Sequence, residues 1–400
     1  MPANTIVYAS LGREMQVHQL DPASGALTPL QSLMMPEVIQ YGWPNRARTM
    51  LYVATSGSGP MAKVKVPHHF VQAFAILPTG ALEPFQPPVR LANRPLHITL
   101  DRAEEHLLVA YNDPPDVTVH RIAPGGGVGE QIEQPPLDFG VTVHQVRVTP
   151  PGTIAVVPAC AHHESGLEAG SVGLFSYRDG RLTPLARMQA DPARVAPWRG
   201  VRHGAHGFAA RHVDFHPKQP WMYLCVETQG EIRLYDYDAD RIALAPRCIK
   251  STLDGVPRGR SSQMASAIQV HPNGRYVYVT NRAWDTEPHT GRQVFVGGVN
   301  DIAVFEIDQA TGEPSLIQHV DTLGIFPRTF GIDATGTVLV VGNQEPFDIR
   351  VGDETQRVAA SLVVFRIAAD GRLSRLHKRD HPDNGAVCFW VGVETIGPTG

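Results

Sequence analysis

One pattern recurs along the whole chain, and it constrains the fold more than any other feature of the sequence. Each copy reads as an apolar strand, a turn of the type (Asp/His)-Pro-x-Gly, a second apolar strand, a third strand, and a Thr-Gly turn that leads to a short fourth strand. The clearest copy spans residues 266–318 and reads SAIQVHPNGRYVYVTNR, then NDIAVFEIDQATGEPSLIQ. Repeated four-stranded units of this kind are typical of β-propellers.

Six full copies and one partial copy account for the chain. The first turns of the full copies fall near residues 45, 101, 151, 217, 272 and 335. This spacing is longer than that of WD-type repeats, and no Trp-Asp signature is present. The N-terminal copy, TIVYASL followed by MQVHQLDPASGALTPLQ, lacks its first strand, whereas the C-terminus has a spare strand, AVCFWVGVE, at residues 386–394.

We therefore expect the last strand to complete the first blade. The chain is predicted to be all-β, a single domain over residues 1–400, with seven four-stranded antiparallel blades. A ring closed in this way leaves no exposed sheet edge. A linear solenoid is the alternative; it would need polar caps, and the shared first blade disfavours it.

Composition excludes several classes of partner. Hydrophobic residues make up 42% of the chain, charged residues only 18%, and the net charge is −4, which does not favour nucleic acid or an anionic membrane. Cys160, Cys225, Cys248 and Cys388 are far apart and form no CxxC pair, which indicates reduced thiols. The N-terminus lacks the features of a secretory signal, and no apolar run is long enough to span a membrane. We expect a cytoplasmic protein and, since a closed propeller is stable alone, a monomer.

The long connections all fall on one predicted face. In a blade, the start of the first strand, the end of the second strand and the loop after it lie on the same face. The turns between first and second strands lie on the opposite face and are tight (HPNG, DATG, TPPG). The long connections all belong to the face just described: 56–67, 161–170, 188–210, 283–300 and 345–360. Long loops on a rigid scaffold commonly carry function, so we predict a pocket over the central channel there.

Ionisable residues ring this predicted pocket. The starts of the first strands contribute His97, His144, Arg211, Ser266 and Arg328; the ends of the second strands contribute Asn112, Glu227, Arg282, Asn343 and Gln344. Any one of them has an ordinary structural explanation, such as Glu227 neutralising Arg211 or Arg282. Burying all of these ionisable groups near the axis is costly in free energy unless they pair with each other or bind a ligand. Their net positive charge favours a small anionic ligand.

The chain resembles the seven-bladed propeller lactonase family. The runs that carry the resemblance are ARHVDFHPKQPWMYLCVE, SAIQVHPNGRYVYVTNR and FPRTFGIDATGTVLVVGNQ. The family includes propeller-type 6-phosphogluconolactonase and the fungal carboxy-cis,cis-muconate lactonizing enzyme. The resemblance covers essentially the whole chain and is strongest over residues 205–345.

This resemblance implies a set of site residues. The positions that match the family's proposed site are His144, Arg211, Glu227 and Arg282, with Arg328 and Gln344 at its PR and NQ positions. We add His97 and Asn343 from the ring as substrate-binding candidates. Val226 stands where the family has an Asn, and the His-bearing loops 63–69 and 161–170 also depart from its pattern.

The predicted function is hydrolysis of an anionic lactone, from a sugar acid or a phosphosugar. Glu227 or His144 would activate water, and Arg211 and Arg282 would hold the oxyanion and a substrate anion. A cycloisomerase needs the same residue types, so hydrolysis and cyclisation both remain open.

Three other chemistries receive less support from the sequence. No GxSxG motif is present, and buried cysteines usually serve as inert packing. The pairs His68-His69, His162-His163 and His203/His206 are the alternative metal ligands, but the inner positions offer Arg and His instead of the carboxylates that calcium needs. We predict no metal and no cofactor. A non-enzymatic binding module also stays open, although it does not require inward-facing Arg, His and Glu.

Overall fold

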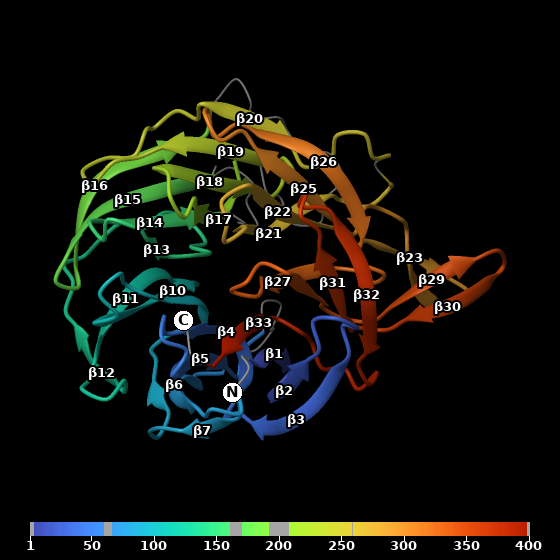
Figure 1. Ribbon diagram of the computed structural model, residues 1–400, viewed down its shortest axis with the longest axis horizontal. Helices are drawn as coiled ribbons and strands as arrows, with labels where there is room; N and C mark the ends of the chain where they lie inside the picture. The colour runs from blue at the N-terminus through green and yellow to red at the C-terminus, as the bar shows by residue number, and fades with distance from the viewer. Residues whose placement is uncertain (1–3, 60–65, 161–169, 192–207, 258, 398–400) are drawn as a thin grey trace.

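The computed structural model describes residues 4–59, 66–160, 170–191, 208–257 and 259–397. Seven antiparallel sheets are arranged around a central axis as the blades of a disc (Figure 1). This arrangement confirms the predicted all-β, seven-bladed propeller. No helix that is long and apolar enough to cross a membrane occurs in these ranges.

The blades are numbered along the chain, and their strands are given from the axis outward. Blade 1 consists of β33 (Val391–Ile396), β1 (Asn4–Leu11), β2 (Glu14–Leu20) and β3 (Leu27–Met34). Blade 2 consists of β4 (Val38–Pro44), β5 (Met50–Ser56), β6 (His69–Ile76) and β7 (Leu82–Pro84), with β8 (Val89–Arg90) also pairing with β6. Blade 3 consists of β9 (Pro95–Leu100), β10 (His106–Asn112), β11 (Pro115–Ile122) and β12 (Val128–Ile132). Blade 4 consists of β13 (Arg147–Val148), β14 (Ile154–Ala159), β15 (Ser171–Arg178) and β16 (Arg181–Gln189).

The remaining blades follow the same order. Blade 5 consists of β17 (Ala210–Phe215), β18 (Trp221–Val226), β19 (Glu231–Asp236) and β20 (Cys248–Ser251). Blade 6 consists of β21 (Met264–Val270), β22 (Tyr276–Arg282), β25 (Asp301–Ile307) and β26 (Pro314–Asp321). Blade 7 consists of β27 (Pro327–Ile332), β28 (Val338–Asn343), β31 (Ser361–Ile367) and β32 (Leu373–Asp380).

The C-terminal strand closes the ring. β33 pairs antiparallel with β1, from Asn4 opposite Ile396 to Ala9 opposite Val391. The last strand is therefore the innermost strand of the first blade, as predicted, and the linear solenoid is wrong. Blade 1 then packs against blade 7 through a cluster that includes Val7 and Val340.

The hydrophobic core is itself a ring. Seven clusters of buried apolar residues each combine side chains from two neighbouring blades of the described structure. Each sheet thus buries both faces, which explains why second strands such as YVYVTNR show little hydrophobic alternation. The apolar burial holds the blades rigidly, and the inner strand ends have fixed positions around the axis.

A repeated hydrogen bond links neighbouring blades. A tyrosine on the second strand of one blade donates its hydroxyl to a glycine carbonyl in the outer turn of the next. This occurs in four pairs: Tyr8 to Gly80 at 2.8 Å, Tyr52 to Gly126 at 2.8 Å, Tyr223 to Gly312 at 2.8 Å and Tyr278 to Gly371 at 2.9 Å. The glycines have positive φ, which a turn of this shape requires. The YVYV and TG-x-L parts of the repeat are thus bonded to each other across blades.

Removing one of these hydroxyls should weaken the ring measurably. Tyr278→Phe leaves the buried carbonyl of Gly371 without its partner, so we expect the free energy of unfolding to fall by about 1–3 kcal/mol. Urea unfolding of the wild type and the variant measures this difference. Tyr223→Phe should lower the free energy of unfolding by a similar amount because its bond to Gly312 is equivalent. Unchanged stability in both variants would contradict a stabilising role for the hydroxyls.

Two predicted long loops pair with each other instead of covering the channel. The connection within blade 6 contains β23 (Thr286–His289) and β24 (Arg292–Phe295), and that within blade 7 contains β29 (Phe347–Val351) and β30 (Glu354–Val358). β24 and β29 pair in parallel, so the two hairpins form one separate four-stranded sheet. This accessory sheet projects from the side of the disc (Figure 1).

The other predicted long loops lie partly or wholly outside the described residues. These parts are residues 60–65 of loop 56–67, all but the last residue of loop 161–170, and most of loop 188–210.

Candidate functional site

The inner strands share an irregularity at the mouth of the channel. In β4, β9, β17, β21 and β27 the pairing register with the second strand shifts by one residue. The residue left unpaired is Gln40 in β4, Arg211 in β17 and Arg328 in β27. A bulge of this kind re-aims a side chain. Arg211 and Arg328 thus occupy equivalent places in different blades, both at the channel.

Strained backbone precedes three of the predicted site residues. Thr142, Phe208 and Phe326 have φ values of 58°, 53° and 65°, a region that non-glycine residues rarely adopt. They lie two or three positions before His144, Arg211 and Arg328 respectively. Cross-strand bonds hold two of them, because the Thr142 carbonyl accepts from the Cys160 amide and the Phe326 carbonyl from the Gln344 amide. Strain of this kind clusters at functional sites.

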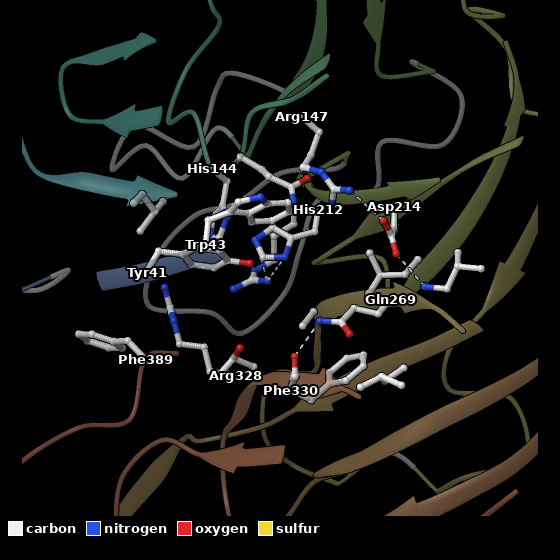
Figure 2. Close-up of a pocket in the computed structure, with 18 of the residues that line it drawn as sticks. Tyr41, Trp43, His144, Arg147, His212, Asp214, Gln269, Arg328, Phe330 and Phe389 are labelled. Atoms are coloured by element: carbon white, nitrogen blue, oxygen red, sulfur yellow. Dashed lines mark hydrogen bonds and ion pairs between the residues drawn. The ribbon is translucent and has the colours of Figure 1, made fainter. Parts of the chain in front are cut away.

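A cavity of about 220 Å³ lies between the inner strands at this level. Its polar wall includes His144, Arg147, Arg211, His212, Asp214 and Arg328, and its aromatic wall includes Tyr41, Trp43, Phe330 and Phe389 (Figure 2). Arg147 pairs with Asp214 at 3.2 Å and lies over the Trp43 ring at 4.9 Å. The cavity is therefore lined by both hydrogen-bonding groups and apolar surface, as ligand pockets usually are.

A buried ion cluster lies beside this cavity. Oε1 of Glu227 is 3.4 Å from Nε of Arg211 and also accepts a close hydrogen bond from Nη2 of Arg282. The exposed fractions of Glu227, Arg211 and Arg282 are only 1%, 1% and 5%. Nη1 of Arg211 further donates to the Ser266 carbonyl at 2.7 Å. Burial lowers the pKa of Arg282 to about 10, against the opposing effect of Glu227. One carboxylate thus holds two guanidinium groups, and neither Glu227 nor Arg282 lines the cavity.

Arg328 differs from these two arginines because it has no carboxylate partner among the described residues. Its guanidinium lies over the ring of Phe389 at 5.1 Å and extends into the cavity (Figure 2). Burial lowers the pKa of Arg328 well below its usual value, and the positive charges of Arg211 and Arg282 add to that effect. Glu227 and Glu345 act on the charge of Arg328 from beyond ion-pair distance. A cation without an ion-paired carboxylate in a cavity is an attractive partner for an anionic ligand.

Three histidines form a row in the channel. The ring centroids of His144 and His212 are 4.9 Å apart, those of His212 and His97 5.9 Å, and those of His97 and Tyr41 4.3 Å. Burial lowers the pKa of all three histidines well below 6.5, and the nearby Arg211 lowers each further. All three imidazoles are therefore uncharged near neutral pH. An uncharged imidazole is able to accept a proton.

His212 and Asp214 are site residues that the sequence reasoning missed. They follow Arg211 in β17, and after the bulge the alternating positions 212 and 214 both face the cavity. Part of the signal was present in HVDF, which has polar residues at every second position, but the adjacent Arg211 interrupts that alternation.

Three of the predicted substrate-binding residues do not line the cavity. Asn343 is fully buried and donates from Nδ2 to the Thr322 carbonyl at 2.9 Å and to Oγ of Ser361 at 3.0 Å. Gln344 donates from Nε2 to Glu345 at 3.0 Å, and His97 is fully buried in the histidine row. Their contact with a ligand stays a prediction.

Val226, which stands where the family has an Asn, removes a hydrogen bond that two other blades form. The equivalent Asn281 donates to the Thr252 carbonyl at 2.7 Å, as Asn343 does to that of Thr322. These asparagines brace the end of a second strand against the preceding connection. Val226 is unable to form such a bond through its side chain, and Glu227 is held instead by its two arginines.

Metal ligation was the alternative for the histidine pairs. His162, His163, His203 and His206 lie outside the described residues. In the described ranges, Nδ1 of His68 is 3.4 Å from Glu37, and Nδ1 of His69 is 3.0 Å from Oγ of Ser56. No group of three or more His, Cys, Asp or Glu placed to hold a metal occurs in those ranges.

Cys160 occupies the position in blade 4 that Glu227 occupies in blade 5. Its Sγ donates to the Ala210 carbonyl at 3.1 Å. Burial and the charge of Glu227 raise the pKa of its thiol well above the usual value. It is therefore a neutral thiol, which does not favour a nucleophilic role.

Comparison with known proteins agrees with the seven-bladed fold. The sequence model of a family described as "Lactonase, 7-bladed beta-propeller" matches residues 7–352. A 6-phosphogluconolactonase of Pectobacterium atrosepticum is 27% identical over 351 residues, covering 86% of this chain and 90% of that protein. Among solved structures, a periplasmic gluconolactonase of Pseudomonas aeruginosa has a TM-score of 0.72 at 18% identity, covering 99% of both chains. A Lactobacillus plantarum protein has a TM-score of 0.70 at 19% identity, covering 99% of this chain and 100% of that one. At these identities the structural likeness shows the fold alone.

Proposed function

The chain belongs to the seven-bladed β-propeller lactonase family, and from that premise we propose that it hydrolyses the lactone of an anionic sugar acid. The observation that carries the proposal is the cavity in which uncharged His144 lies beside Arg211 and Arg328, the latter without a carboxylate partner among the described residues. Because the relative from Pectobacterium atrosepticum is named 6-phosphogluconolactonase, 6-phosphogluconolactone is the first substrate to test.

We assign the general base to His144. Its Nδ1 is buried without a hydrogen-bond partner in the described structure, which leaves Nε2 to act at the cavity. Nε2 takes a proton from water as the water oxygen bonds to the lactone carbonyl carbon. The carbonyl oxygen becomes an oxyanion next to Arg211, whose buried guanidinium stabilises that charge. The ring C–O bond then breaks, and the departing alkoxide takes the proton back from His144 to give the hydroxy acid.

Glu227 has a different role in this proposal. Its carboxylate is nearly inaccessible, and its Oε1 contacts both Arg211 and Arg282. A carboxylate engaged in this way is a poor proton acceptor, because protonation would weaken its charge-assisted hydrogen bond from Arg282 and its ion pair with Arg211. Glu227 is therefore a positioning residue that fixes the orientation of Arg211.

We further propose that residues 1–400 act as one domain, as a cytoplasmic monomer with no nucleic-acid or membrane partner. Its four cysteines are free in the described structure. In the described structure, the closure of the ring through β33 leaves the outer strand of each blade as its free edge.

The test is a proton-release assay on a panel of lactones below pH 7, where spontaneous hydrolysis is slow. The panel contains 6-phosphogluconolactone, gluconolactone and muconolactones, each with and without EDTA. Turnover above the spontaneous rate that EDTA does not change supports hydrolysis by a metal-free site. No turnover of any lactone would refute the proposal, and activity lost in EDTA would refute the metal-free mechanism.

The pH dependence gives a separate prediction. The neutral form of His144 is the active one, and its pKa is lowered, so kcat/KM should stay constant as pH falls through 6.5 and decline only in more acidic solution. A bound anion partly neutralises Arg211 and Arg328, which raises the pKa of His144 in the complex. We therefore expect the acid limb of kcat at a higher pH than that of kcat/KM. Steady-state kinetics from pH 4 upward measure both limbs, and the reverse order would contradict the assignment of His144.

A further inference from the structure

A second arginine, also without a carboxylate partner in the described part of the chain, contacts a residue of the cavity wall. Arg94 directly precedes β9, and only 8% of its surface is exposed. Its Nη2 donates to Oε1 of Gln40 at 2.7 Å, and its Nη1 lies 3.4 Å from Oδ1 of Asn112. Its Nε is buried and has no hydrogen-bond partner in the described structure. The neutral amide oxygens of Gln40 and Asn112 leave the positive charge of Arg94 uncompensated.

Gln40 connects Arg94 to the cavity. Gln40 is the bulge residue of β4, at the position that Arg211 and Arg328 have in their own blades, and it lines the cavity. The positive charge of Arg94 also contributes to the lowered pKa of Arg328. Arg94 and Arg328 lie on either side of the inner strands of blades 1 and 2, and Gln40 of blade 2 joins Arg94 to the cavity that Arg328 lines.

The other arginines of the channel are paired. Arg48 contacts Glu394, Arg147 contacts Asp214, and Arg211 and Arg282 share Glu227. In the described structure, Arg94 and Arg328 are the two arginines of this group that have no carboxylate within ion-pair distance. Glu227 and Glu345 act on Arg328 only as charges beyond ion-pair distance. Two buried cations without an ion-paired carboxylate are costly in an empty protein, and the cost is lowered when an anion binds between or beside them.

We propose that Arg94 and Arg328 form an anion subsite that takes a negatively charged group of the substrate, remote from the lactone carbonyl. This inference rests on the proposed function. The subsite explains how the cavity distinguishes a lactone that carries a phosphate or a free carboxylate from one that carries neither. Arg328 contacts that group, and Arg94 adds charge and holds Gln40 in the cavity wall.

Equilibrium binding of open-chain sugar acids, the products of lactone hydrolysis, tests the subsite without relying on catalysis. Isothermal titration with gluconate, the dicarboxylate glucarate and 6-phosphogluconate compares ligands of increasing charge. We expect wild-type protein to bind 6-phosphogluconate at least about 10-fold more tightly than gluconate, and Arg94→Gln to lose about 10- to 100-fold in 6-phosphogluconate affinity but little in gluconate affinity. Arg94→Lys should restore most of the loss because it keeps the charge. The glucarate affinity shows whether the subsite accepts a carboxylate as well as a phosphate.

The control is Arg275→Gln, which removes an exposed arginine from the turn between β21 and β22 on the opposite face of the disc. It should leave all three affinities unchanged, and thermal melting checks that each variant folds. If Arg94→Gln lost affinity for gluconate and for 6-phosphogluconate equally, Arg94 would have only a structural role and the inference would be overturned. A wild type that shows no preference among the ligands would also overturn the inference, even if it hydrolyses lactones. Charge-selective binding by a protein that hydrolyses no lactone would instead uphold the subsite and refute the proposed function.

Discussion

Replacement of His144 by glutamine should lower the kcat of lactone hydrolysis by about 100- to 10,000-fold, the range that a positioned general base contributes. Glutamine is similar in length and remains polar, so the cavity keeps its shape and the anion-binding arginines keep their places. The loss should therefore appear in kcat while KM changes little. Proton release at saturating substrate measures the effect directly.

Two further histidine variants make this result specific. His377 lies on the exposed outer strand β32, so His377→Gln should have wild-type kinetics. His212 packs against the ring of His144 at 4.9 Å, and His212→Gln should reduce kcat less than the His144 change does, because it alters only the position of the base. If His144→Gln kept the wild-type kcat, His144 would not be the general base, and Glu227 would be the remaining candidate that the sequence offered.

The fold could be predicted because its information is repeated along the chain. Each copy carries the same order of apolar strands and glycine turns, so an ambiguous copy is interpreted with the help of the clear one at 266–318. The ring closure followed from counting strands, since the first copy lacked one strand and the C-terminus had one to spare. The structure adds what counting does not show, such as the bond from Tyr278 to Gly371 that joins two blades.

The site could be predicted only where strand position decides side-chain direction. His144, Arg211 and Arg328 begin inner strands, so their place at the channel follows from topology. His212 was missed because a bulge changes the alternation of β17, and bulges depend on pairing with a neighbouring strand. Arg94 was missed because it precedes its strand, in a connection whose path has no local sequence signal.

The pairing of the two insertions shows a similar limit. The sequence indicated that 283–300 and 345–360 emerge on the same face, but not that β24 and β29 would hydrogen-bond in parallel. Such contacts depend on the distance between neighbouring blades and not on either segment alone. The sequence also left open whether Glu227 or His144 is the base, because burial and ion pairing arise only from the packed ring.

Glu227→Gln should lower the free energy of unfolding by about 3–5 kcal/mol, the usual cost of removing one partner from a buried ion pair. The variant leaves Arg211 and Arg282 buried, with exposed fractions of 1% and 5%, around a neutral amide. Activity should fall as well, since Arg211 loses the group that orients it. Urea unfolding and proton release measure the two effects on the same preparations.

The double variant Glu227→Gln with Arg282→Met separates stability from function. Methionine keeps apolar contact with the Phe326 ring, over which the Arg282 guanidinium lies at 4.7 Å, and removes one of the two uncompensated charges. Since a buried ion pair contributes little net stability over packed apolar groups, the double variant should be more stable than Glu227→Gln alone while its activity stays low. The single variant Arg282→Met, in which Glu227 still pairs with Arg211, provides the fourth corner of the cycle. A double variant no more stable than Glu227→Gln would show that the uncompensated charge is not the cause of the loss, and the role of Glu227 as the counter-ion of both arginines would be wrong.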